Sequence, residues 1–167
     1  MLIKNLEDCQ NYTTTTVALV TSHLDGKHNI MSAEWSIRAS IEPYLVAVFV
    51  GYERETYSFI KNSGEFALNY CSSDLGFLAH VCGNYSFKNV DKFSKFNIPY
   101  LEGVKTKCRI IKGSIMSVEC KVINEYHAGD HAIFIGSVQE GYFDDEKSPL
   151  VFYGGKFFNV GNRVKYD

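Results

Sequence analysis

The apolar positions of the chain fall in short runs that are separated by glycine, asparagine and aspartate, and these runs are rich in β-branched and aromatic residues. Such a pattern is typical of β-strands joined by tight turns. It predicts seven strands, at residues 15–22, 29–36, 45–51, 65–71, 116–127, 132–143 and 150–160. The strands follow one another too closely for repeated βαβ units, so we expect a mostly antiparallel barrel or sandwich.

Two segments between the strands have a helical pattern instead. "RETYSFIKNSG" (54–64) places Tyr57 and Ile60 on one face and ends in Gly64, a residue type common just after a helix. "SSDLGFLAHVCG" (72–83) begins with Ser and Asp and stops at Gly83. From residue 84 to 113 the period is lost, which predicts a long loop with one helical turn, and loops of that length are more often functional than accidental.

The chain length and charge limit the classes of protein to consider. The 167 residues suit one domain over 1–167, and the net charge of -2 offers no broad positive field for nucleic acid. The longest apolar run, "LVAVFVG", is far shorter than the roughly 20 residues that span a membrane. Charges in the opening "MLIKNLEDCQ" argue against a secretory leader, so we expect a cytoplasmic protein.

The reactive side chains form no familiar catalytic motif. Five cysteines without a C-x-x-C pair indicate reduced thiols and no metal site, and Cys71 and Cys120 in strand-like stretches should be buried and inert. No G-x-S-x-G, P-loop, H-E-x-x-H or strand-to-helix G-x-G-x-x-G motif is present. Function therefore depends on a cofactor or on binding alone.

The segment "LVAVFVGYERETYSF" is a candidate phosphate site. Its strand leaves the sheet through Gly51 and enters a helix near Arg54. Free N–H groups at a helix start, the Arg54 guanidinium and the Thr56 hydroxyl are the groups that a phosphate needs. An ordinary strand-to-helix turn with an exposed arginine is the alternative.

Two further segments could face a ligand. In "DGKHNIMSAEW" (25–35), a turn is followed by small side chains at 31–33 whose accessible main chain could take a flat ring, and Trp35 either walls that pocket or fills the core. In "HAGDHAIFIGSVQEG", His131 stands at a strand entrance, where it either faces substrate in a barrel mouth or is a surface residue.

Taken in order, these segments resemble the flavin reductase-like family, whose members bind FMN in a split β-barrel. The resemblance runs from about Thr15 to Val160 and rests on "VALVTS", "DGKHNIMSAEW", "YLVAVFVG" after Pro43, "RETYSFIKNSGEFALNY", "VDKF", "VECKV", "AGDHAIFIGSVQEG" and "PLVFYGGKFF". It implies an all-β, antiparallel Greek-key split barrel with short helices. It also implies FMN (with FAD possible) as cofactor, NAD(P)H as co-substrate, and a homodimer with its flavin sites at or near the subunit contact.

The resemblance also implies roles for particular residues. The flavin ring would lie along 29–35, the phosphate would be held by the turn 51–56, His131 would lie near the nicotinamide, and Lys92 would lie close to the cofactor. The implied cofactor-binding residues are Asn29, Met31, Ser32, Ala33, Glu34, Trp35, Val50, Gly51, Arg54, Thr56 and Lys92. Glu34 departs from the pattern, because a small or hydroxyl residue is common there. A carboxylate aimed at the ring would disfavour the anionic reduced flavin, unless it points to solvent.

The leading hypothesis is an FMN-dependent oxidoreductase that takes hydride from NAD(P)H and passes electrons to free flavin, ferric complexes or a partner protein. An alternative is an FMN-binding electron carrier, similar to flavoredoxin, or a flavin-binding module without NAD(P)H oxidase activity. A third is a non-redox interaction domain that has lost the cofactor. The intact segments 29–35 and 51–56 argue against the third.

Overall fold

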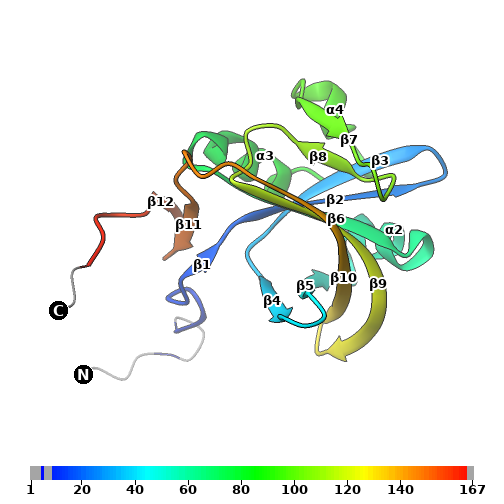
Figure 1. Cartoon of the computed structure of the whole chain (residues 1–167), viewed down its shortest axis with the longest axis horizontal. Helices are drawn as coiled ribbons and strands as arrows, with labels where there is room; N and C mark the ends of the chain where they lie inside the picture. Colours follow the sequence, from blue (N-terminus) through cyan, green and yellow to red (C-terminus); the bar gives the residue numbers. More distant parts are fainter. Residues whose placement is uncertain (1–4, 6–8, 165–167) are drawn as a thin grey trace.

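The computed structural model describes residue 5 and residues 9–164, so the predicted absence of a leader in "MLIKNLEDCQ" lies mostly outside the described residues. Its main sheet has the strand order β3-β2-β6-β9-β10-β5-β4, and every neighbouring pair is antiparallel. The strands are β2 (Ala18–Leu24), β3 (Lys27–Ala33), β4 (Ser36–Ser40), β5 (Leu45–Gly51), β6 (Glu65–Tyr70), β9 (Met116–Ala128) and β10 (His131–Phe143). Figure 1 shows β9 and β10 curving away from β2 and β3 toward β4 and β5. The sheet therefore curls into a split barrel whose end strands, β3 and β4, are not hydrogen-bonded to each other.

Smaller elements surround this sheet. The strands β1 (Thr15–Thr16), β11 (Leu150–Tyr153) and β12 (Lys156–Asn159) form a three-stranded sheet, and β7 (Tyr100–Glu102) pairs with β8 (Arg109–Ile111). The helices are α2 (Glu55–Ser63), α3 (Gly76–Asn84) and α4 (Lys92–Lys95), with a 3-10 turn at Ser73–Leu75. Among the described residues, none of the helices is long and apolar enough to cross a membrane.

The curl of the sheet follows from the long β9–β10 hairpin. Its register shifts between Ile135 and Gly136 and again between Val138 and Glu140, and such bulges bend and twist a strand pair. A side chain at Gly136 would collide with Phe66 and Cys120, so only glycine fits where β10 crosses the core. The bend wraps the sheet around a buried apolar cluster that includes Phe66 and Phe134.

Burial makes the thiols of three cysteines unreactive. Cys71, Cys108 and Cys120 are at most 1% exposed, and burial raises the pKa of Cys71 and of Cys108 to about 12 and raises that of Cys120 further. Their thiolate forms are therefore scarce at neutral pH.

Most predicted elements are confirmed, including the end of α2 at Gly64, which is left-handed with φ 70. The predicted single strand 150–160 is wrong, because Gly154 and Gly155 have positive φ and make the tight turn of the β11–β12 hairpin. The strand predicted over 29–36 ends at Ala33, and the separate strand β4 was not predicted. The predicted loop 84–113 holds its one helical turn as α4, but it also contains β7 and β8. The helix predicted to stop at Gly83 runs one residue further, to Asn84.

Candidate functional site

The β2–β3 hairpin and the start of α2 meet through one buried hydrogen bond. Asp25 and Gly26 both have positive φ, which suits a two-residue hairpin turn and sets the register of β3 against β2. In that register the buried amide of Asn29 donates from Nδ2 to Thr56 Oγ1 at 2.9 Å. The two segments that the sequence singled out separately are therefore joined.

A cavity of about 210 Å³ lies at this junction. Its lining combines β3, the start of α2, α3 and the segment that leads to α4: Asn29, Met31, Glu53, Arg54, Glu55, Thr56, Cys82, Tyr85, Ser86, Phe87 and Lys92. No side chain caps the first turn of α2, whose N-cap residue is Arg54. The first N–H groups of a helix lack partners within the helix, so this turn offers donors to an anion. We call this space the anion cavity.

Lys92 is an unusual lining residue of the anion cavity, because it is a buried cation. It is 3% exposed, and its Nζ donates to the Tyr85 carbonyl at 2.9 Å. Burial, with a smaller effect from the positive charge of Arg54, lowers the pKa of Lys92 to about 8, although Cys82 acts in the opposite direction. Among the described residues no carboxylate forms an ion pair with Lys92. A buried cation is costly without a counter-charge, so an anion suits this position.

A second cavity, of about 180 Å³, is a neighbour of the first, since Met31 and Arg54 line both. We call it the ring cavity; it is lined by Met31, Ser32, Ala33, Glu34, Trp35, Phe49, Gly51, Arg54 and His131. Trp35 is 49% exposed, and its ring centroid lies 4.7 Å from that of His131 and 6.3 Å from that of Phe49. The tryptophan is therefore a wall of the cavity and does not fill the core.

Arg54 and His131, which line the ring cavity, each lie beside a carboxylate. Arg54 Nε lies 3.0 Å from the Glu53 carboxylate, and His131 Nδ1 lies 2.6 Å from the Asp130 carboxylate. The hydrogen bond from His131 lowers the pKa of Asp130. Glu34 has no such partner among the described residues, and burial raises its pKa.

Nearly all the implied site residues line these two cavities. The exception is Val50, which is fully buried in the core and lines neither of them. Phe49, the residue before it, lines the ring cavity, and strand alternation points these two side chains to opposite faces. The sequence pattern also did not predict Tyr85, Ser86 and Phe87, which reach the anion cavity from an aperiodic segment.

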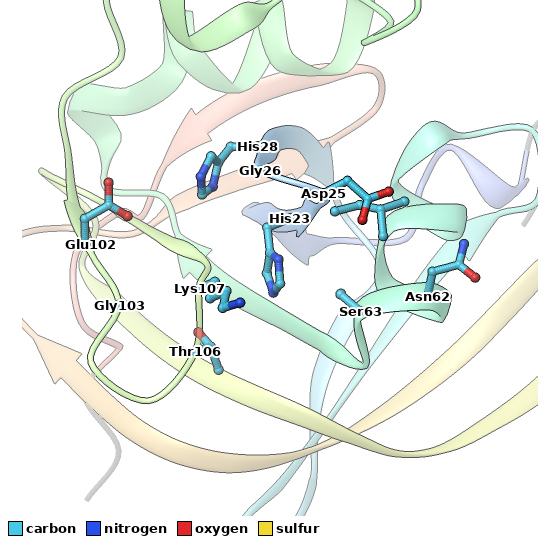
Figure 2. Close-up of a pocket in the computed structure, with 11 residues that line it drawn as sticks. His23, Asp25, Gly26, His28, Asn62, Ser63, Glu102, Gly103, Thr106 and Lys107 are labelled. Carbon is cyan, nitrogen blue, oxygen red and sulfur yellow. The ribbon is translucent and has the colours of Figure 1, made fainter.

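A larger cavity of about 590 Å³ lies elsewhere (Figure 2). It is bounded by the tip of the β2–β3 hairpin, the end of α2 and the β7–β8 loop. His23 and His28 are cross-strand neighbours, and His28 is on the face of β3 opposite to Asn29. In this cavity His23 Nε2 lies 2.8 Å from Glu65 and the Thr106 hydroxyl donates to Glu119, whereas the buried Nδ1 of His28 has no hydrogen-bond partner among the described residues. Among the described residues, no group of three or more His, Cys, Asp or Glu could hold a metal ion.

Comparison with known proteins identifies the family. The family model described as the flavin reductase like domain matches residues 11–161. The chain belongs to the flavin reductase-like family. A flavin reductase of Pseudomonas putida is 31% identical over 147 residues, which cover 87% of this chain and 82% of that protein. An uncharacterized protein of Archaeoglobus fulgidus is 33% identical over 112 residues, which cover 67% of this chain and 63% of that protein.

Solved structures of this family have the same fold. The flavin reductase PheA2 in its native state superposes with a TM-score of 0.82 at 28% identity, covering 93% of this chain and 96% of that one. The NADH:FAD oxidoreductase SgcE6 of Streptomyces globisporus superposes with a TM-score of 0.88 at 22% identity, covering 97% and 98%. The predicted split-barrel fold and flavin reductase type of oxidoreductase are confirmed.

Proposed function

We propose that this flavin reductase-like protein binds FMN, accepts hydride from NAD(P)H, and passes electrons to free flavin, ferric complexes or a partner protein. The observation that carries the proposal is Lys92, a buried cation beside Arg54 and the start of α2 that forms no ion pair with any described residue. These groups suit a phosphate, and the adjoining ring cavity suits the flat end of the same ligand. The two cavities together fall within the range of about 300–1,000 Å³ typical of small-molecule sites.

The residues present fit a flavin mononucleotide. Arg54, Thr56, Lys92 and the first N–H groups of α2 would hold the phosphate. The main chain of 31–33 would contact the ring, and bound flavin would supply the acceptor for hydride. FAD would need additional room for its second phosphate and adenosine beyond the anion cavity.

Trp35 and His131 stand at the exposed side of the ring cavity, where we place the nicotinamide. His131 is held by Asp130 and packs on Trp35, so its ring is positioned before a ligand arrives. The chain has no Rossmann motif for the rest of the nucleotide. We therefore expect modest affinity for NAD(P)H and little discrimination between NADH and NADPH.

The affinity for FMN should fall roughly tenfold between pH 7 and pH 9, because Lys92 has a pKa of about 8 and binds phosphate best when protonated. Fluorescence titration of the apoprotein with FMN measures this change. Lys92→Met should bind FMN weakly at both pH values, whereas Lys112→Met, which changes an exposed lysine outside both cavities, should behave as wild type. A pH-independent affinity in the wild type would remove Lys92 from the phosphate site.

We also propose that a second copy of the chain covers β4. This strand is an outer strand of the seven-stranded sheet, where unpaired backbone groups invite association. Ile37 in β4 is 62% exposed, and Ile41, directly after β4, is 77% exposed. A partner there would bury these side chains and help to enclose the flavin.

Light scattering coupled to size exclusion tests this interface. We expect a dimer for the wild type and a monomer for Ile37→Glu, because the new carboxylate would be buried without a partner. Leu101→Glu, at an exposed leucine of β7, should stay dimeric. A wild-type monomer at micromolar concentration, or a dimeric Ile37→Glu, would contradict the proposal.

Enzyme assays separate the reductase from an electron carrier. Steady-state oxidation of NADH and NADPH is followed with free FMN, a ferric chelate and no acceptor. The reductase predicts turnover that rises with the acceptor. Tight FMN binding without NAD(P)H oxidation would indicate the flavoredoxin-like alternative.

A further inference from the structure

The ring cavity contains one ionisable side chain whose charge the protein leaves unbalanced. Arg54 is paired with Glu53 and His131 is paired with Asp130. Glu34 lines the same cavity and forms neither a hydrogen bond nor an ion pair with any described residue. The formal charge of this space therefore depends on whether Glu34 holds a proton.

The position of Glu34 is fixed by its neighbours. It stands in the two-residue connection between β3 and β4, after the buried Ala33 and before Trp35. The side chain is half-buried, and burial alone raises its pKa above the ordinary value of 4.5. Burial thus already favours the neutral form of this carboxyl group, and a new negative charge nearby would favour the neutral form further.

We propose that Glu34 takes up a proton when the flavin in this pocket is reduced. The inference rests on the proposed function. In the balanced step, NAD(P)H loses a hydride and becomes NAD(P)⁺, and the flavin gains that hydride and one negative charge. The Glu34 carboxylate then takes one proton from solvent and becomes the neutral acid, so the pocket gains no net charge.

The other charged groups around the cavity do not offer the same response. Arg54, just before α2, is paired with Glu53, whose side chain is 70% exposed. The hydrogen bond to His131 lowers the pKa of Asp130, in the turn before β10, which keeps that carboxyl ionised. Lys92 of α4 lines the anion cavity and not the ring cavity. Glu34 is therefore the carboxyl group lining this cavity that no described cation pairs with.

Proton counting tests the assignment directly. FMN-loaded protein is photoreduced under argon in a weakly buffered solution near pH 7, and a pH indicator reports the protons taken up per two electrons. We expect the wild type to take up more protons than Glu34→Gln, with a difference approaching one. The matched control Glu146→Gln, at an exposed carboxylate outside both cavities, should equal the wild type.

Infrared spectroscopy gives a second readout. In the infrared difference spectrum of the wild type, reduction should produce the C=O stretch of a carboxylic acid, and this band should be missing in Glu34→Gln. Equal proton counts together with an absent band would overturn the role of Glu34 while leaving the flavin site intact. Failure of the wild type to bind FMN in the same preparation would overturn the proposed function, and this inference with it.

Discussion

Replacing Arg54 and Thr56 together with alanine should lower the affinity for FMN roughly a hundredfold or more. Each replacement removes a donor to the phosphate, and a hydrogen bond to a charged group contributes about 1.5–3 kcal/mol. Thr56 also accepts from Asn29, so part of the loss could come from the scaffold. Isothermal titration with FMN measures the total effect.

Riboflavin separates the loss of phosphate contacts from damage to the scaffold, because it has the same ring without the phosphate. Its affinity for the double variant should fall far less than that of FMN, because riboflavin has no phosphate to lose and the main-chain contacts at 31–33 remain. A matched variant is Lys61→Ala, which removes an exposed cation from the other end of α2 and should leave FMN binding unaltered. Equal FMN affinities in the double variant and the wild type would place the phosphate elsewhere.

Replacing Glu119 with glutamine should destabilise the protein by about 2–4 kcal/mol. This carboxylate is fully buried, and it accepts hydrogen bonds from the N–H groups of Val104, Lys105 and Thr106 and from the Thr106 and Tyr142 hydroxyls. An amide would turn one acceptor into a donor that faces these donors. Urea denaturation measures the loss, and Glu125→Gln, at an exposed carboxylate of the same strand, should cost less than about 1 kcal/mol.

The pH dependence of stability gives an independent check on Glu119. Burial by itself raises the pKa of this carboxyl, but the hydrogen bonds from Val104, Thr106 and Tyr142 outweigh burial and lower it. A carboxyl with a lowered folded-state pKa adds stability that is complete above its ordinary value of 4.5. That stability is lost as the pH falls through the folded-state value, so wild type and Glu119→Gln should converge in acid. A gap that persists unchanged in acid would contradict this account.

The strands and α2 were predictable from sequence because their signals are local. Gly64 ends α2 where the pattern predicted, and Leu45–Gly51 is bounded as expected. The strand predicted at 150–160 failed because continuous aromatic residues concealed the Gly154–Gly155 turn. The strand β4 was missed because its exposed side chains, such as Ile37, do not alternate with buried ones.

Part of the site was predictable because its sequence signals are also local. The hairpin 25–35 and the turn 51–56 each carry a local pattern, and their meeting through Asn29 and Thr56 depends on tertiary structure. The burial of Lys92 without a counter-charge could not be foreseen, because its segment has no period and its surroundings come from β3 and α3. The unpaired state of Glu34 likewise appears only when the pairs formed by Arg54 and His131 are known.

The absorption spectrum of the purified protein tests the central claim most directly, before and after addition of FMN and then of NADH under argon. We predict a perturbed flavin band on binding, saturating at one FMN per chain, and bleaching of that band by NADH. A colourless protein that leaves the spectrum of added FMN unchanged would contradict the account.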